Sequence, residues 1–255
     1  MGGGVRPMAT PERSRPHPAP EEGVRHGRLS ARPVAVPPQH AEPLVPGLHR
    51  LGGRALLYVP SARGPGPSSL AVVLHGAGGA AEEALEWLLP QAEESGVLLL
   101  APQAVSATWD MIVGGYGADV SRVDAALEEV FSRAAVGLDG VAVAGFSDGA
   151  SYALSLGLAN GDLFHAVLAF SPGFMAPMIR HGRPRIFVSH GVSDRVLPID
   201  ECSRRLVPEL RESGYEVTYE EFRGGHQVPP QTAAAAVRWW ISQRPGHSTG
   251  DVSPG

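Results

Sequence analysis

Residues 141–151, VAVAGFSDGAS, carry the most informative pattern in the sequence. Its first half is an uninterrupted apolar run, as expected for a strand buried on both faces of a sheet. The run ends in G-x-S-x-G at residues 145–149. Two residues without a Cβ atom let a strand and a following helix approach closely while Ser147 adopts a strained backbone conformation. The stretch therefore predicts a strand, a sharp turn that presents the Ser147 hydroxyl, and a helix.

A serine at this position can also serve as an ordinary helix cap, and G-x-S-x-G by itself is a weak signal. Its place between a buried strand and a helix N-terminus favours a nucleophile, because backbone N–H groups and the helix dipole stabilise negative charge there.

The pattern around this stretch alternates between strands and helices. Apolar runs of strand length lie at residues 54–60, 70–76, 96–102, 166–172, 185–191 and 215–222. Helical patterns lie near residues 80–95, 119–134, 147–160, 199–213 and 230–243. We expect Asp119 to cap the second of these helices and Pro90 to kink or split the first. Such alternation predicts an α/β fold with a doubly wound, mostly parallel sheet in one domain.

The two ends of the chain lack this pattern. Residues 1–27 are rich in Pro, Gly, Arg and Glu, so we expect a disordered tail, and Met8 is an alternative start to Met1. We assign residues 28–244 to the catalytic domain and residues 245–255 to a flexible tail.

Composition narrows the class of protein. The chain has 255 residues, 43% of them hydrophobic and 18% charged, which allows a sizeable core. The formal net charge of −5, with arginine and no lysine as the basic residue, argues against a nucleic-acid partner. No apolar run is long enough for a membrane span and no secretory signal is visible, so we expect a cytoplasmic protein. The single cysteine, Cys202, excludes an internal disulfide and is expected to pack in a helix.

A serine nucleophile needs a base, and the best placed of the 10 histidines is His226. It follows the last strand, so it should lie at the same edge of the sheet as Ser147. The acid that orients this base is expected between them in the chain, and Asp194 follows the strand 185–191 there. Asp200 is the nearest rival, although it is placed to begin a helix. Asp162 precedes its strand and so lies at the wrong edge.

A transition-state oxyanion needs backbone donors. LHGAGG, residues 74–79, ends an early strand in a glycine-rich turn. We assign the donors to the backbone N–H groups of Ala77 and Asp148. His75 precedes the serine in the chain and is expected to brace this turn, and we expect structural roles for His165 and His190.

These motifs resemble those of the α/β-hydrolase superfamily, and within it the phospholipase- and carboxylesterase-like serine esterases. The resemblance runs from about Gly27 to Trp240 and lies in LHGAGG, GFSDGAS, HGVSDRVLP and GGHQVPP. It implies a two-step acyl transfer with Ser147 as nucleophile, His226 as base and then acid, and Asp194 as its orienting carboxylate, with no metal and no cofactor. Many carboxylesterases have glutamine where this chain has Asp148, an anion that would disfavour anionic substrates.

The resemblance also suggests where a substrate binds. Trp109 and the residue after it are similar to a stretch that borders the acyl pocket of these esterases. The segment after the strand 166–172 is too short for a separate cap domain, which predicts an open cleft. Its apolar candidates are Trp109, Met111, Phe174 and Met175. Core packing is the alternative for each of them, and for Met111 the two interpretations are equally balanced. Such a cleft suits small to medium acyl esters.

Other functions stay open at this point. A serine peptidase or amidase uses the same three residues, and thioesters and aryl esters are further substrates for such a site. A non-catalytic binding module would not require all three. We expect a small-molecule ester as partner, and a homodimer is left open.

Overall fold

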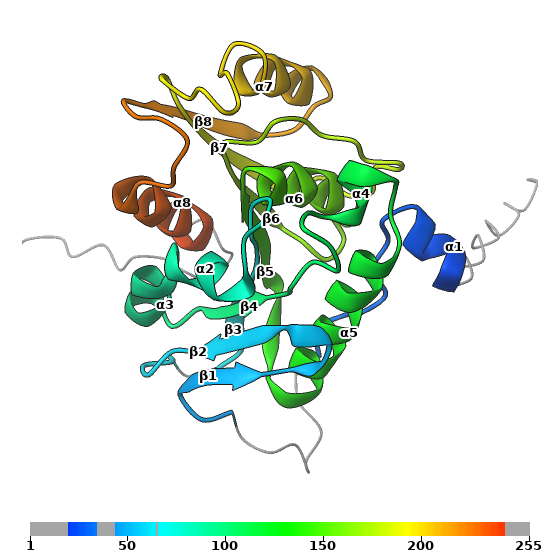
Figure 1. Cartoon of the computed structure of the whole chain (residues 1–255). Coiled ribbons are helices and arrows are strands. Elements are labelled where there is room, and N and C mark those ends of the chain that lie inside the picture. Colours follow the sequence, from blue (N-terminus) through cyan, green and yellow to red (C-terminus); the bar gives the residue numbers. More distant parts are fainter. Residues whose placement is uncertain (1–19, 35–43, 65, 243–255) are drawn as a thin grey trace, which may run out of the picture.

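A computed structural model describes residues 20–34, 44–64 and 66–242, in which eight strands form one sheet (Figure 1). The strands are β1 (Gly47–Arg50), β2 (Leu56–Val59), β3 (Ser68–Leu74), β4 (Leu98–Ala101), β5 (Val136–Phe146), β6 (Ala166–Phe170), β7 (Arg185–Gly191) and β8 (Val217–Phe222). The helices are α1 (Pro20–Arg25), α2 (Ala81–Glu86), α3 (Leu89–Ser95), α4 (Asp110–Val113), α5 (Ala118–Arg133), α6 (Asp148–Ala159), α7 (Ser203–Glu212) and α8 (Pro230–Ser242), with a short 3₁₀ turn, η1 (Gly52–Arg54).

The strand order β1-β2-β4-β3-β5-β6-β7-β8 places the site-bearing strands side by side. From β4 to β8 all neighbouring strands run parallel, and the pairs β1–β2 and β2–β4 are antiparallel. The chain leaves β3 for β4 on one side and then crosses to β5 on the other. Ligands of open α/β sheets bind at the carboxyl ends of strands at such a switch point. The carboxyl ends of β3 and β5 are therefore the expected place for a site.

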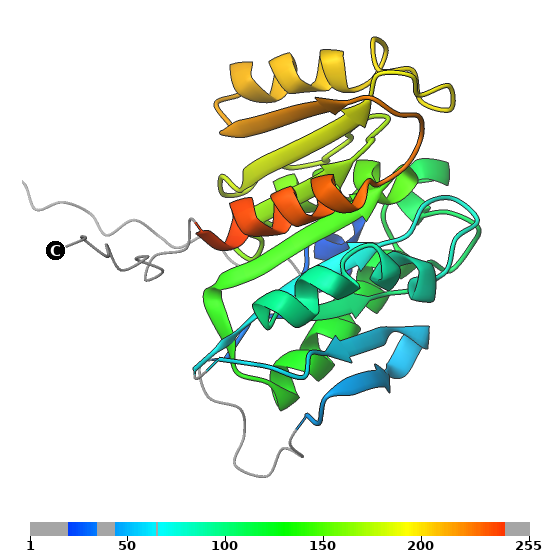
Figure 2. The ribbon, with the colours of Figure 1, turned by 90° about the vertical axis from the view of Figure 1, so that its left-hand side faces the viewer.

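Helices cover both faces of the sheet. In β3, Leu70 and Leu74 pack into the core beneath α5 and α6, whereas Ala71 and Val73 pack into the core beneath α2, α3 and α8. Figure 2 shows α8 and α3 side by side on the second face. Because both faces are buried, the central strands β3 to β7 contain continuous apolar runs, unlike the edge strands β1 and β8. The prediction of a single, doubly wound α/β domain with a mostly parallel sheet is confirmed.

Some local predictions differ from the structure. β1 was not predicted, because its residues alternate between exposed and half-buried positions at the sheet edge. Pro90 does split the first helix, at the start of α3. Asp119 is not the cap of α5, whose N-cap is Gly117. Its buried carboxylate instead accepts hydrogen bonds from the backbone amides of Val105 (2.7 Å) and Asp110 (2.8 Å).

The N-terminal tail expected over residues 1–27 is wrong for residues 20–27, which form α1 and the turn after it. Arg28 anchors the segment that follows, through hydrogen bonds to the carbonyl of Ala159 (2.6 Å) and the carboxylate of Asp162 (2.7 Å). The amide of the buried Leu29 donates to Asn160 (2.9 Å). Polar anchors on distant helix ends leave no apolar periodicity in the sequence, which is why the segment looked unstructured. Residues 1–19 and the predicted C-terminal tail, residues 245–255, lie outside the described residues.

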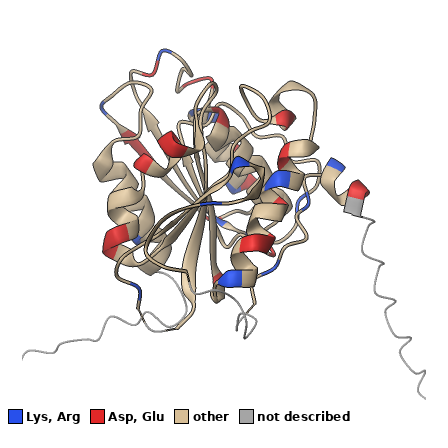
Figure 3. Cartoon of the chain, turned by 60° about the horizontal axis from the view of Figure 1, so that its bottom comes forward, with Lys and Arg blue, Asp and Glu red and all other residues tan. Residues whose placement is uncertain are grey.

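Charged residues lie mainly on the helices and loops around the sheet, with both signs interspersed (Figure 3).

Within the described ranges, none of the helices has the length and apolar character that crossing a bilayer requires. Residues 171–184, between β6 and β7, contain no helix, so no cap domain is inserted there.

Candidate active site

Ser147 lies at the turn between β5 and α6 with φ 57° and ψ −123°, a conformation that L-residues rarely adopt. The two glycines of the motif explain how the turn closes. A Cβ on Gly145 would lie 2.1 Å from the carbonyl oxygen of Gly149, and one on Gly149 would lie 2.2 Å from that of Leu74. Only glycine fits either position, so the motif brings α6 directly against β3 and β5 and presents the serine at the carboxyl edge of the sheet.

His226 and Asp194 meet Ser147 at this edge. His226 lies in the loop between β8 and α8, and its Nε2 is 2.8 Å from the Ser147 Oγ. Its Nδ1 is 2.7 Å from the Oδ2 of Asp194, in the loop after β7. A carboxylate accepts from Nδ1–H, which leaves the Nε2 lone pair to accept the proton of the serine hydroxyl. The structure thus brings together the three residues that the sequence singled out.

The Asp194 carboxylate is fully buried, with 0% of its side chain exposed. Its Oδ1 accepts hydrogen bonds from the backbone amides of Val196 and Leu197, each at 2.9 Å. Burial by itself would raise the pKa of Asp194, but the hydrogen bonds from the Leu197 amide, His226 and the Val196 amide outweigh it, and the pKa is lowered. Asp194 is therefore charged at neutral pH.

The glycine-rich turn after β3 borders the serine. A Cβ on Gly76 would lie 3.4 Å from the Cβ of Ser147. The turn is closed by hydrogen bonds from the Gly79 amide to the Gly76 carbonyl (3.0 Å) and from the Gly78 amide to the Ala107 carbonyl (2.6 Å). Neither the Ala77 amide nor the Asp148 amide donates to an acceptor in the described part of the chain. Both remain able to donate to a ligand.

His75 braces this turn, as the sequence suggested. Its Nδ1 is 2.8 Å from the carbonyl oxygen of Gly76, and its Nε2 accepts a hydrogen bond from the Ala104 amide (3.1 Å). Burial lowers the pKa of His75, which keeps the ring neutral. The ring links the turn after β3 to the segment after β4.

The substrate-binding assignment needs a correction at Trp109, whose side chain is fully buried and cannot line an open cleft. Its indole N–H donates to the His75 carbonyl (2.9 Å), and its ring stacks on Tyr152. Met111 and Met175 are half-buried and pack against the core, whereas Phe174 is 39% exposed. A resemblance in sequence does not show which way a side chain points, and the indole finds its hydrogen-bond partner inside.

An aromatic pair beside the candidate catalytic residues was not anticipated. Phe146, the residue before Ser147, lies with its ring centroid 4.6 Å from that of His226. Trp87, at the end of α2, meets Phe146 edge-on at 5.4 Å. In the sequence, the one feature that could have indicated this contact is that Phe146 occupies the first variable position of G-x-S-x-G, directly before Ser147.

The two other aspartates considered as partners of His226, Asp200 and Asp162, form ion pairs elsewhere in the molecule. Asp200 is 77% exposed and pairs with Arg204 at 2.8 Å, and Asp162 pairs with Arg28.

Cys202 is buried directly before α7, where burial raises the pKa of its thiol. No grouping of His, Cys, Asp and Glu side chains suited to a metal ion occurs among the described residues.

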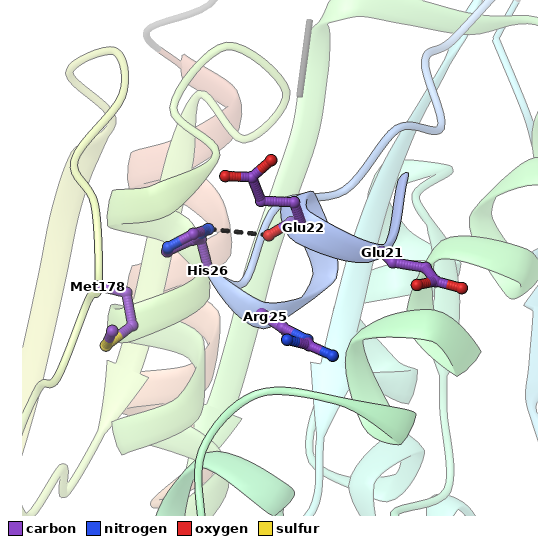
Figure 4. A pocket seen from close by; sticks show the side chains of 5 residues that line it. All are labelled: Glu21, Glu22, Arg25, His26 and Met178. Carbon is purple, nitrogen blue, oxygen red and sulfur yellow. Dashed lines mark hydrogen bonds between the residues drawn. The ribbon is translucent and has the colours of Figure 1, made fainter. Parts of the chain in front are cut away.

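A cavity of about 600 Å³ lies between α1 and the segment after β6 (Figure 4). It is lined by Glu21, Glu22, Arg25, His26 and Met178. The candidate catalytic residues do not line it. The site is therefore assigned from the side-chain geometry at the sheet edge.

The chain is similar to known proteins over about three quarters of its length. No protein-family model matches the chain. The probable feruloyl esterase C of Aspergillus niger is 28% identical over 235 residues, which cover 77% of this chain and 86% of that protein. The solved structure of esterase PE8 is 22% identical and superposes with a TM-score of 0.61, covering 77% of this chain and 99% of that one. The Bacillus cereus carboxylesterase is 18% identical with a TM-score of 0.58, covering 74% and 93%.

At these identities the solved structures establish the fold, which is that of the α/β-hydrolase esterases. The curated relatives and the solved structures that this chain resembles are themselves esterases.

Proposed function

We propose that the protein hydrolyses carboxylic esters with small to medium acyl chains through Ser147, His226 and Asp194 and an acyl-enzyme intermediate. One observation carries the proposal: the unbroken contact chain from Asp194 through His226 to the Ser147 hydroxyl, at 2.7 Å and 2.8 Å. A nucleophile hydrogen-bonded to a base that is itself oriented by a buried carboxylate is the arrangement that acyl transfer requires.

In the first step, Oγ of Ser147 bonds to the ester carbonyl carbon while Nε2 of His226 takes the hydroxyl proton. The buried Asp194 carboxylate stabilises the imidazolium that forms, and the backbone amides of Ala77 and Asp148 donate to the oxyanion. Preorganised donors of this kind contribute about 10²–10³ each to the rate.

The tetrahedral intermediate then collapses. The bond to the leaving alcohol breaks, and His226 returns its proton to the alcohol oxygen, which leaves the acyl group on Ser147. Water repeats the sequence with His226 again as base, so that the acid is released and the serine hydroxyl is restored.

Two observations bear on the substrate. The segment 171–184 carries no helix over the site, and Phe174 exposes part of its ring there, which supports an uncapped, apolar cleft. The half-buried pair of Phe146 and Trp87 beside His226 supports a second candidate, an aryl ester whose flat ring packs on these side chains. The curated relative named a feruloyl esterase points the same way.

The test is a series of p-nitrophenyl esters from two to sixteen acyl carbons, with methyl ferulate, an anilide and a thioester alongside. Fluorophosphonate labelling is read in parallel by peptide mass spectrometry. We expect the label on Ser147 and turnover greatest on short acyl or on aryl esters. Turnover confined to the anilide or the thioester would replace the ester assignment.

Ser147→Ala supplies the decisive variant, and Ser132→Ala, at an exposed position on α5, is its matched control. Ser147→Ala should lose both label and turnover and keep its fold, while Ser132→Ala should behave as the parent. Residual activity of Ser147→Ala within about tenfold of the parent would rule out Ser147 as nucleophile, since removing a catalytic nucleophile costs far more.

A further inference from the structure

We propose that His190 is a positioning residue, which holds the Asp194 carboxylate in the orientation in which it binds His226. The inference rests on the proposed function, because it gives His190 a part in the same site as Ser147. His190 has no place in the acyl-transfer steps, yet its ring touches the carboxylate on which they depend.

The His190 ring is completely buried at the carboxyl end of β7. Its Nε2 lies 2.8 Å from the carbonyl oxygen of Leu197 and 3.3 Å from the Oδ2 of Asp194. Its Nδ1 lies 2.6 Å from the Oγ of Ser203, the first residue of α7. One ring therefore joins the strand, the loop that carries Asp194 and the helix that follows.

These partners define where the ring proton lies. A carbonyl oxygen can only accept, so Nε2 must carry the proton that it donates to Leu197. Ser203 then donates its hydroxyl proton to Nδ1. Burial lowers the pKa of His190, which keeps the ring neutral in this tautomer. The same N–H group faces the Asp194 carboxylate at longer range.

The backbone of Leu197 connects His190 to Asp194, because its amide and its carbonyl are both hydrogen-bonded. Its amide donates to Oδ1 of Asp194 (2.9 Å), while its carbonyl accepts from His190 (2.8 Å). Oδ2 of Asp194 is contacted by His226 at 2.7 Å and by His190 at 3.3 Å. Rotation of the carboxylate would break contacts on both oxygens, so the direction in which it faces His226 is set by this set of donors.

A buried histidine with satisfied nitrogens can also serve packing alone. The contact with the carboxylate itself distinguishes the two roles, since packing needs only the ring. The other titratable groups nearby are Cys202, beside Ser203, and Glu221, paired with His190 in the β7–β8 register. Glu221 binds Arg204 at 2.7 Å, so Asp194 is the carboxylate whose position His190 controls.

The test compares His190→Phe, which keeps a ring of similar size without nitrogen, with His190→Gln, which restores an N–H near the position of Nε2. We expect His190→Phe to lower kcat on p-nitrophenyl acetate about ten- to a hundredfold with KM within about twofold. The acid limb of the kcat/KM profile should move to higher pH, because a carboxylate that loses a donor attracts a protonated base more strongly. His190→Gln should recover most of both losses.

Three further variants separate the outcomes. His165→Gln removes a histidine at the opposite edge of the sheet and should leave rate and pH profile unchanged. Ser203→Ala removes the hydrogen bond that Nδ1 of His190 accepts. It should shift the acid limb in the same direction, which tests the inference if His190→Phe does not fold. Ser147→Ala reports on the proposed function independently of His190.

Parental kcat and pH profile in folded His190→Phe, or in folded Ser203→Ala where His190→Phe is not recovered, would overturn the inference. So would equal losses in His190→Phe and His190→Gln with an unmoved profile and a lowered melting temperature, which is the pattern of packing alone. If instead Ser147→Ala retains turnover, the proposed function itself fails.

Discussion

The hydroxyl of Thr108 donates a hydrogen bond of 2.6 Å to the carboxylate of Asp148, 40 residues further along the chain. The residues on either side of Thr108, Ala107 and Trp109, bind the glycine-rich turn after β3. The Ala107 carbonyl accepts from the Gly78 amide, and the Trp109 indole donates to the His75 carbonyl. The three residues 107–109 thus fasten both of the turns whose amides we propose as oxyanion donors.

Replacing Thr108 with valine keeps the shape of the side chain and removes the donor. Because a hydrogen bond to a charged group is lost, we expect about 1–2 kcal/mol lower stability and a kcat about three- to tenfold lower, with KM little changed. Steady-state kinetics and urea unfolding check this, with Thr108→Ser as the control that keeps the hydroxyl. Identical kinetics for the serine and valine variants would show that the hydrogen bond has no effect on the site.

Gly149→Ala should be far more damaging than its small size suggests. The added Cβ would lie 2.2 Å from the Leu74 carbonyl oxygen, so α6 must move away from β3. We expect a loss of about 3 kcal/mol or more of unfolding free energy, or insoluble protein. Gly64→Ala is the control, because nothing lies within 4 Å of its added Cβ, and it should stay within about 0.5 kcal/mol of the parent. Comparable stability of the two variants would contradict the close approach of α6 and β3.

Asp162 links the folding of the N-terminal segment to pH. Burial alone would raise the pKa of Asp162, but Arg28 and Arg32 outweigh it and hold the pKa well below its usual range. Its contribution is therefore fully present above the unfolded-state pKa of about 4 and is lost as the pH falls through the lower, folded-state pKa.

Asp162→Asn should accordingly cost about 1–3 kcal/mol at pH 7, and its deficit should shrink as the pH falls below about 4. Urea unfolding between pH 2 and pH 7 measures both effects. Asp200→Asn, at a largely exposed carboxylate, is the control and should show neither. A deficit that stays constant over the whole range would contradict the ion pairs as its source.

Phe174 and Trp109 should respond in opposite ways to truncation. Phe174→Ala removes a partly exposed ring at the proposed cleft, so we expect KM for the preferred ester to rise about three- to tenfold with little change in stability. Trp109→Ala empties a fully buried position and should cost about 3–5 kcal/mol of unfolding free energy. Kinetics and thermal unfolding of the pair test whether Phe174 belongs to the cleft; unchanged KM with lower stability would place it in the core.

How far the site could be predicted differs from residue to residue. Ser147, Asp194 and His226 each follow a recognisable strand, and in a parallel sheet all such positions fall at one edge. Their convergence was therefore predictable. The inward direction of Trp109 was not, since the same apolar residue type serves a cleft or a core. The aromatic contact of Phe146 with His226 also left no distinct signal in the sequence.

The class of fold, the order of the candidate catalytic residues and the strained serine turn could all be predicted from the amino-acid sequence, because buried strands, glycine positions and strand ends are local properties. Three features are visible only in the folded chain: the histidine nitrogen that meets Asp194, the contact of His190 with the same carboxylate, and the ion pair of Arg28 and Asp162 that holds the N-terminal segment in place. These depend on side-chain directions and on contacts between residues far apart in the chain, for which local patterns carry no information.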